Sequence, residues 1–396
     1  MQPYSFARRA SIVGVLLSKW WPLVAIALFA PVVWGRDCRV YFGTFTDTTS
    51  RGIYVSRLDM DTGKLSAPQL AAAIGNPNYL AISPDGRFLY AAARADANST
   101  NGAVCAFAID GGTGKLRLLD QKSSGGSVVC YAGLDAAGQC MFAANYGSGS
   151  VKSFHMNADG TLADGTFIQH YGSSINPGRQ KGPHAHCFVA APDGRFALAC
   201  DLGLDKVVVY KFNPLDATLT PNDPPFATLE PGSGPRHVVF SPDGKTACVI
   251  SEMACTVTVF DWDAVAGKLT GRQSLPLLPP GEYQDTFTAA EIAYRPDGRF
   301  VYATVRGPMV PGANSVSVLA ADAKTGNLSL IQNLPCGGNF PRGMAVDPSG
   351  RWLVVGNQKS GTVTVFGIDT NTGKLTLTGQ VLEVGSAVDV KFAPIQ

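Results

Sequence analysis

Residues 341–375 read PRGMAVDPSGRWLVVGNQKSGTVTVFGIDTNTGKL, and this stretch holds one structural repeat. An apolar segment leads to the turn Pro348-Ser349-Gly350, and a second apolar segment follows the turn. After the polar loop Gly356-Asn357-Gln358, the side chains of residues 362–366 alternate between polar and apolar, as in a half-buried β-strand. The turn Thr372-Gly373-Lys374-Leu375 then precedes a fourth strand. The stretch therefore predicts a four-stranded antiparallel meander.

Both turns recur along the chain. The first has six copies, at residues 83–86, 135–138, 192–194, 242–244, 296–298 and 348–350. The second has seven, at residues 62–65, 113–116, 159–162, 216–219, 266–269, 325–328 and 372–375. The glycines that end the first turns stand at positions 86, 138, 194, 244, 298 and 350. A period of roughly 50 residues is typical of a β-propeller, in which each repeat forms one blade.

The two ends of the repeat region complete one another. The region begins at Val40-Tyr41-Phe42-Gly43-Thr44, which matches a second strand, and ends at residues 388–394, which match a first strand. A blade shared between residues 39–65 and 380–394 would close the ring and leave no exposed sheet edge. The predicted fold is an all-β, seven-bladed β-propeller over residues 37–396, with no long helix after residue 36.

The bulk composition agrees with such a domain and limits the kinds of partner that are expected. Only 16% of the 396 residues are charged and 45% are hydrophobic, which excludes a disordered chain. The net charge of +2 gives no indication of a nucleic-acid partner. The 44 glycines and 26 prolines suit a fold with many turns.

The N-terminal segment differs from the rest of the chain. Arg8, Arg9 and Lys19 precede an apolar run from Trp20 to Trp34. This arrangement predicts a secretory signal peptide or an uncleaved membrane anchor over residues 1–36. No other contact with a membrane is expected. Export to the periplasm or the medium follows if the segment is a signal, and a cytoplasmic location follows otherwise.

The nine cysteines do not indicate a metal site. None forms a Cys-x-x-Cys pair, and their odd number excludes a complete disulfide framework. Most lie in apolar strand patterns, where cysteine behaves as a small buried hydrophobe. No metal and no cofactor are predicted.

Loop order predicts where the chemistry lies. In a four-stranded meander the connections alternate between the two faces of the ring, so both recurring turns share one face, the bottom. The connections between second and third strands, and those between blades, share the other face, the top. Polar side chains gather in the top connections, at 145–147, 182–186, 201–203, 234–237, 251–252, 289–292, 305–307, 340–343 and 356–358.

These motifs resemble the lactonase family of seven-bladed propellers, which includes 6-phosphogluconolactonase and the fungal carboxy-cis,cis-muconate cyclase. The resemblance covers roughly residues 39–394 and rests on the motifs at 182–186, 201–203, 289–292 and 341–347, and on Gly234-Pro235-Arg236-His237 followed by Glu252. It implies lactone chemistry on the top face. Val305 and Gly343 depart from residues usual in the family, as does the N-terminal extension.

The resemblance also suggests site residues. A His, an Arg, a Glu and a second Arg are linked to catalysis in the muconate cyclases, and the matching positions are His184 or His186, Arg236, Glu252 and Arg306. Substrate contacts are expected from Asn145, His237, Glu291 and Arg342. The structural alternative is that Arg236 and Glu252 form an ion pair between blades.

The function hypothesis is hydrolysis of a sugar-acid lactone, with 6-phosphogluconolactone as the first candidate. Glu252, His184 or His186 would take a proton from water, and arginines would stabilise the oxyanion or grip a phosphate or carboxylate. No Gly-x-Ser-x-Gly motif is present, which disfavours a covalent serine mechanism. Two alternatives stay open: a cyclase that closes a carboxymuconate to its lactone, and a non-enzymatic exported binding module. The expected partner is a small anionic lactone, bound by a monomer or a small homo-oligomer.

Overall fold

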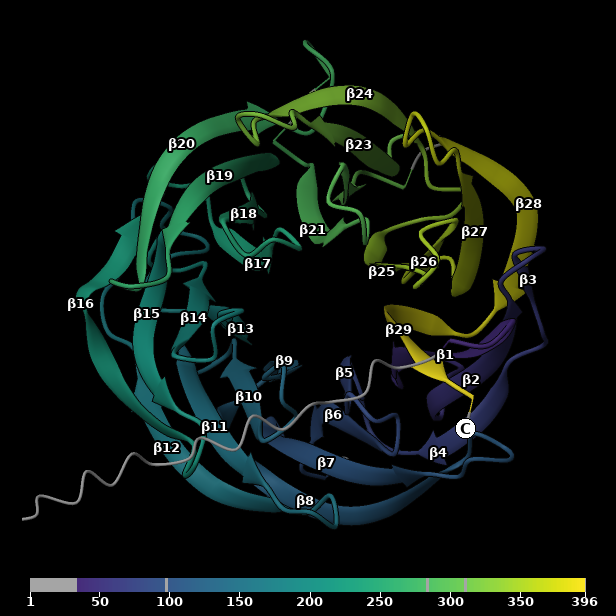
Figure 1. Cartoon of the computed structure of the whole chain (residues 1–396), viewed down its shortest axis with the longest axis horizontal. Helices are drawn as coiled ribbons and strands as arrows, with labels where there is room; N and C mark the ends of the chain where they lie inside the picture. Colours follow the sequence, from purple (N-terminus) through teal and green to yellow (C-terminus); the bar gives the residue numbers. More distant parts are fainter. Residues whose placement is uncertain (1–33, 97–98, 283–284, 310–311, 396) are drawn as a thin grey trace, which may run out of the picture. The chain divides into compact units, whose positions relative to one another are not determined.

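The computed structural model describes residues 34–96, 99–282, 285–309 and 312–395, which form a ring of β-sheets around a central axis (Figure 1). Seven sheets are present in this part of the chain, which confirms the predicted seven-bladed β-propeller. The predicted signal peptide or anchor lies almost wholly in residues 1–33, outside the described residues. Among the described residues, no helix is long and apolar enough to cross a bilayer.

The blades follow one another around the ring, and each runs from an innermost to an outermost strand. The blade that joins the two termini contains β29 (Ser386–Pro394), β1 (Asp37–Phe45), β2 (Gly52–Asp59), β3 (Lys64–Leu65) and β4 (Gln69–Ala73). The next two contain β5 (Tyr79–Ile82), β6 (Phe88–Arg94), β7 (Asn101–Ile109) and β8 (Leu116–Ser127), then β9 (Val129–Leu134), β10 (Cys140–Asn145), β11 (Ser150–Met156) and β12 (Leu162–Gln169). The fourth and fifth contain β13 (Ala185–Ala190), β14 (Phe196–Asp201), β15 (Lys206–Asn213) and β16 (Thr218–Thr228), then β17 (Pro235–Phe240), β18 (Thr246–Ser251), β19 (Thr256–Asp263) and β20 (Lys268–Pro276). The last two contain β21 (Thr288–Tyr294), β22 (Phe300–Arg306), β23 (Ser315–Ala321) and β24 (Leu328–Pro335), then β25 (Pro341–Val346), β26 (Trp352–Asn357), β27 (Thr362–Ile368) and β28 (Leu375–Glu383).

The ring closes through antiparallel pairing of β29 with β1, as the sequence predicts. Two boundaries of the shared blade differ from the prediction. Residues 380–383 belong to β28 of the preceding blade. The N-terminal segment of the shared blade does not end at residue 65 but continues to Ala73, the end of β4. The outer strand is divided into β3 and β4 because Pro68 lies between them and has no N–H to donate to the ladder.

The described fold also begins slightly before the predicted boundary at residue 37. Trp34 packs against the apolar cluster of the shared blade, and the Met60 amide donates to the Arg36 carbonyl at 3.0 Å. These contacts attach residues 34–36 to the propeller.

Contacts between neighbouring blades explain why the two turns recur together. At Gly160, φ is +86° and an added Cβ would lie 2.4 Å from the ring of Phe88 in the preceding blade. Only glycine combines this backbone conformation with so close an approach. The Tyr90 hydroxyl donates to the Gly160 carbonyl at 3.0 Å, and Tyr302 makes the same bond to Gly373. Each of these second turns therefore covers the aromatic start of the second strand of the blade before it.

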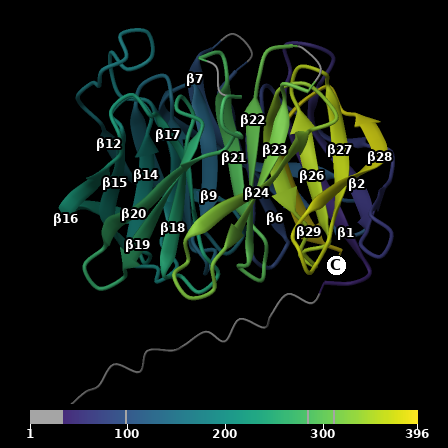
Figure 2. The ribbon, with the colours of Figure 1, turned by 90° about the horizontal axis from the view of Figure 1, so that it is seen from above.

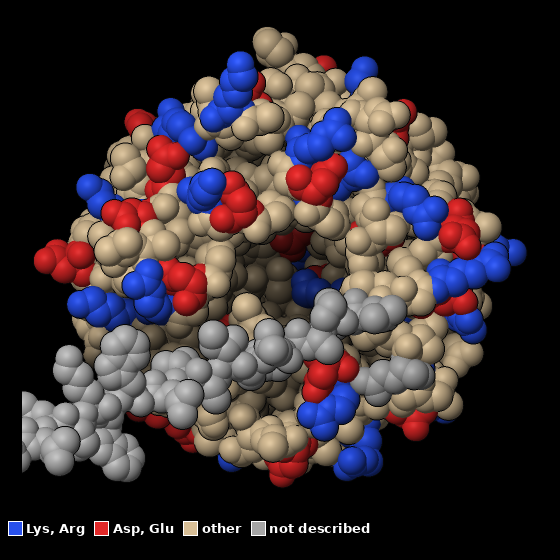
Figure 3. All heavy atoms as spheres, viewed as in Figure 1, with Lys and Arg blue, Asp and Glu red and all other residues tan. Residues whose placement is uncertain are grey.

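The strands run between two faces, so the connections collect on opposite sides of the ring (Figure 2). Side chains between blades form the core, as where Phe142 of β10 contacts Phe188 and Phe212 of the next blade at ring-centroid distances of 5.0 Å. The innermost strands leave a hollow at the centre of the ring, and charged residues of both signs follow its rim (Figure 3).

We expect deletion of residues 385–396 to prevent stable folding. The deletion leaves β1 without its inner partner strand and removes the Asp389 carboxylate that accepts from the Leu80 amide of the next blade at 2.7 Å. Loss of the buried Val388 and Val390 alone would cost roughly 3–6 kcal/mol. Thermal unfolding monitored by circular dichroism measures the effect, and a chain that lacks only residues 395–396 serves as control. A truncated chain that melts like the parent would contradict this account of ring closure.

Candidate functional site

A cavity of about 290 Å³ lies where the top connections meet the central axis. Ten residues line it: Phe45, Asn78, Val128, Cys130, Tyr146, Arg179, His186, Glu252, Arg306 and Arg342. All ten lie in a top connection or at the adjoining end of a strand. This cavity therefore lies at the face where the loop order predicts that the polar side chains gather.

Irregular pairing at the start of the innermost strands helps to direct these side chains. Pro235 pairs with Ser251 and His237 pairs with Ile250, so Arg236 has no partner of its own and forms a β-bulge. His186, Arg342 and Cys130 occupy the same bulge position in three other blades. Bulges next to active sites commonly redirect a side chain out of the regular alternation. Here three of the four residues at this position line the cavity.

Three arginines surround the carboxylate of Glu252. Arg179 Nη2 lies 2.7 Å from Oε1, while Arg306 Nη2 and Arg236 Nε lie 3.0 Å and 3.1 Å from Oε2. Glu252, Arg236 and Arg306 are buried. Arg236 lies on β17, Glu252 lies in the connection after β18, and Arg306 ends β22. The predicted ion pair between Arg236 and Glu252 is present, but both residues belong to the blade of β17–β20, so the pair lies within one blade and not between blades. Arg306, on β22, supplies the contact to Glu252 from the next blade.

The cluster keeps Glu252 ionised. Burial alone would raise the pKa of Glu252, but the guanidinium groups of Arg306, Arg236 and Arg179 outweigh burial and hold it well below its ordinary value of 4.5. A general base works best when its pKa lies near the working pH. Glu252 is therefore poorly suited to take a proton from water, and its carboxylate instead fixes the positions of the arginines.

Arg236 lies behind Glu252 rather than in the lining of the cavity. Its Nη1 donates to the Ala290 carbonyl at 2.6 Å and to His237 Nε2 at 3.2 Å, while Nε faces Glu252. The guanidinium thus joins the top cavity to residues deeper in the channel.

The two histidines of the 182–186 motif differ in their surroundings. His184 Nδ1 donates to the Tyr146 carbonyl at 2.8 Å, and its ring stacks on Tyr146 outside the cavity lining. His186 lines the cavity, and its Nδ1 is buried without a hydrogen-bond partner among the described residues. Burial, with Arg236, His237 and Arg342 nearby, lowers the pKa of His186 well below 6.5. At neutral pH His186 is therefore an uncharged imidazole.

Arg342 is the cavity arginine without a carboxylate partner in the described part of the chain. Its guanidinium lies over the Phe45 ring at 5.3 Å, and no carboxylate there lies within ion-pair distance. Burial and the charges of Arg236 and Arg306 lower the pKa of Arg342 to about 9, so it remains charged at neutral pH. An anionic ligand group would supply the missing counter-charge.

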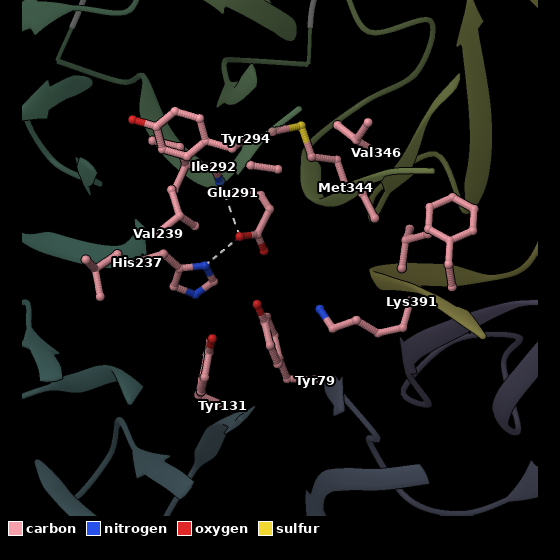
Figure 4. Close-up of a pocket in the computed structure, with 15 residues that line it drawn as sticks. Tyr79, Tyr131, His237, Val239, Glu291, Ile292, Tyr294, Met344, Val346 and Lys391 are labelled. Atoms are coloured by element: carbon pink, nitrogen blue, oxygen red, sulfur yellow. Dashed lines mark hydrogen bonds and ion pairs between the residues drawn. The ribbon is translucent and has the colours of Figure 1, made fainter. Parts of the chain in front are cut away.

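Three residues expected to bind substrate lie elsewhere. The Asn145 amide is buried and donates to the Ser124 carbonyl and the Ser150 hydroxyl, which fixes the loop after β10. His237 and Glu291 line a second cavity of about 240 Å³ farther along the channel (Figure 4). The structure does not bring these three side chains to the top cavity, whereas it brings Arg342 there.

The sequence reasoning missed Arg179, Phe45 and Asn78. Arg179 is the most important, because it lies 2.7 Å from Glu252 and 3.2 Å from the Tyr146 hydroxyl. It belongs to the connection between β12 and β13, just before the motif at 182–186. The rule that connections between blades share the top face would have included it.

Comparisons with known proteins agree with the fold. Residues 39–392 match the sequence model of the family described as lactonase, seven-bladed β-propeller. The chain is 34% identical over 353 residues to 6-phosphogluconolactonase of Bacillus subtilis, which covers 89% of this chain and 97% of that protein. It is 31% identical over 360 residues to 6-phosphogluconolactonase of Formosa agariphila, and the match covers 89% of this chain and 99% of that protein. The solved structure of a periplasmic gluconolactonase from Pseudomonas aeruginosa shares 34% identity and a TM-score of 0.85, over 91% of this chain and 100% of that one.

We expect Glu252→Gln to lower the free energy of unfolding at pH 7 by about 3–5 kcal/mol, because three guanidinium groups lose their shared counter-charge. The folded pKa of Glu252 is depressed, so its stabilisation is fully present above about pH 4.5 and is lost as the pH falls toward the folded value. Urea unfolding between pH 3 and 7 should therefore show a weaker acid dependence in the variant. Glu383→Gln, at an exposed position, is the matched control. Equal stability of Glu252→Gln and the parent at pH 7 would contradict the cluster's role.

Proposed function

This chain belongs to the lactonase family of seven-bladed β-propellers, and we propose that it hydrolyses the lactone ring of a sugar acid, with 6-phosphogluconolactone as the first candidate substrate. The observation that carries the proposal is that one cavity contains an uncharged histidine, His186, and an arginine, Arg342, that has no carboxylate partner among the described residues. Ester hydrolysis needs a proton acceptor for water and cations for the developing oxyanion. The cavity contains groups for both tasks.

His186 is the proposed general base. It would take a proton from water as the water oxygen attacks the lactone carbonyl carbon. The tetrahedral oxyanion then collapses, the ring C–O bond breaks, and the ring oxygen leaves as an alcohol with the proton from His186. Burial lowers the pKa of His186 most, and the guanidinium groups of Arg236 and Arg342 lower it further. An anionic substrate that offsets the charge of these arginines would raise the proton affinity of His186 during binding.

Arg179 and Arg306 are the proposed oxyanion donors. Both line the cavity, and both are held by Glu252 at distances of 2.7 Å and 3.0 Å. Donors fixed in advance need no reorganisation when charge develops in the transition state. In this mechanism Glu252 is a positioning residue, because it acts through the arginines.

The charge of the site favours an anionic lactone. Arg179, Arg236, Arg306 and Arg342 bring four positive charges, and among the cavity-lining residues only Glu252 is acidic. Arginine binds phosphate and carboxylate through paired hydrogen bonds, which suits Arg342 as the anchor for the charged end of a substrate. An uncharged lactone would leave this cation without a partner.

The same proposal includes the protein's location and state. A relative named as a periplasmic gluconolactonase supports an export signal in residues 1–36. The protein then binds a small-molecule lactone outside the cytoplasm. It does so as a monomer or a small homo-oligomer.

We expect His186→Gln to lower kcat for lactone hydrolysis by roughly 10²–10⁴-fold, because the general base is lost while the cavity keeps its shape. Initial rates of acid release, corrected for spontaneous ring opening, measure the loss. His155→Gln is the matched control, since His155 lies on β11 away from the cavity. Unchanged turnover in His186→Gln would remove His186 from the mechanism.

We expect Arg342→Gln to raise KM for a phosphorylated lactone by roughly 10- to 100-fold, the loss typical of a charged hydrogen bond. The constants for the unphosphorylated lactone should change little, because that substrate has no anion for Arg342 to hold. Steady-state kinetics on both lactones provide the test, with Arg195→Gln on the bottom turns as control. An equal change in KM for the two substrates would show that Arg342 does not bind the anionic group.

A further inference from the structure

His237 lies between two charged residues from different strands. Its Nδ1 is 2.8 Å from Glu291 Oε1, and its Nε2 is 3.2 Å from Arg236 Nη1. The three side chains are buried, with exposed fractions of 2% for Arg236 and His237 and 5% for Glu291. Figure 4 shows the imidazole of His237 directed at Glu291 within the second cavity.

The partners determine the tautomer of His237. Arginine can only donate, so Nε2 must accept from Arg236 and carries no hydrogen. An ionised carboxylate can only accept, so Nδ1 must carry the hydrogen that it donates to Glu291. Burial would raise the pKa of Glu291, but His237 and nearby cations outweigh it and lower the pKa, which keeps Glu291 ionised. Burial lowers the pKa of His237 to about 4 against the opposing charge of Glu291, so the imidazole is neutral at neutral pH.

These bonds continue into the top cavity. Arg236 holds Glu252 Oε2 through Nε, and Glu252 holds Arg179 and Arg306. The orientation of Arg236 about its side-chain axis is fixed on one edge by His237 and the Ala290 carbonyl. A rotation of this guanidinium would move the carboxylate of Glu252 and, with it, both arginines of the cavity.

We propose that Glu291 and His237 form a positioning relay, in which Glu291 selects the His237 tautomer that orients Arg236 and thereby the Glu252 cluster. The proposal rests on the proposed lactone hydrolysis for its kinetic consequence, whereas its geometry stands independently. Neither His237 nor Glu291 lines the top cavity, so both act through Arg236 rather than on the substrate.

Other groups around His237 are compatible with this role. Tyr79 and Tyr131 present ring edges at centroid distances of 5.5 Å and 5.4 Å, and the His186 ring lies at 5.1 Å. Lys391, on the innermost strand of the shared blade, faces the same cavity but is paired with Asp389 at 2.8 Å. Within the described part of the chain, none of these four side chains forms a hydrogen bond to a ring nitrogen of His237.

The first experiment reads the tautomer directly. Side-chain nitrogen NMR of the full chain should show His237 protonated at Nδ1 and unprotonated at Nε2, and its signal is identified as the one that disappears in His237→Gln. In Glu291→Gln we expect mixed tautomers, because an amide can donate or accept where the carboxylate only accepts. A parent His237 protonated at Nε2 would overturn the relay, whether or not the protein hydrolyses lactones.

The second experiment measures the kinetic consequence. His237→Phe keeps an aromatic ring but removes both polar atoms, and it should lower kcat by roughly 10- to 100-fold with KM nearly unchanged. His237→Gln should recover most of kcat, because its amide can donate to Glu291 and accept from Arg236. A packing role for His237 would give the opposite order, since phenylalanine fills the site better than glutamine.

Matched measurements separate the possible failures. Tyr131→Phe removes a hydroxyl from the same cavity but keeps the ring that packs against His237 and both hydrogen bonds of the relay, so it should keep the parent kcat. If His237→Phe does not fold, the comparison of Glu291→Gln with the parent decides: an unchanged kcat would overturn the proposal. If the parent hydrolyses no lactone, the proposed function fails, and the tautomer experiment still decides whether the relay exists.

Discussion

The pairing of β29 with β1 is the constraint on which the rest of the structure depends. Because the first and last strands share a blade, the innermost strands must converge on one axis, and their upper ends must meet there. Asp389 of β29 also holds the Leu80 amide of the next blade, so closure links three consecutive blades through one strand. Residues distant in sequence, such as Arg179 and Glu252, come into contact because consecutive blades bring their top connections together.

Within the closed ring, one carboxylate organises the charge of the site. Three guanidinium groups at 2.7–3.1 Å from Glu252 would repel one another without it. Their burial strengthens both the attraction and the cost of losing it, because the surroundings screen charge poorly. The same arrangement lowers the proton affinity of Glu252, and it leaves Arg342 without a carboxylate partner in the described part of the chain. Stability and the proposed preference for an anionic substrate therefore have a common electrostatic origin.

The channel contains two polar compartments joined by Arg236. The upper one is lined by arginines and the uncharged His186, and the lower one by tyrosines, Glu291 and Lys391. Hydrogen bonds from Glu291 through His237 to Arg236 connect them. Buried charges are tolerated where they are paired and hydrogen-bonded, as Glu252 is by three arginines and Glu291 is by His237.

The sequence by itself determined the repeat, the seven blades, the split closing blade and the face that carries the polar side chains. These follow from local chemistry: glycine at a positive φ, alternation along strands, and the parity of connections in a meander. Only the tertiary structure decided which polar residues meet. The β-bulges at His186, Arg236 and Arg342 alter the regular alternation, and no local pattern marks them in advance. The position of Asn145 in a top connection predicts a substrate contact, yet its amide donates hydrogen bonds to Ser124 and Ser150. Arg179, in contrast, contacts Glu252, which lies 73 positions away in the sequence. Local sequence fixes the direction of the backbone, but the partners of a buried polar group depend on side chains that other blades supply.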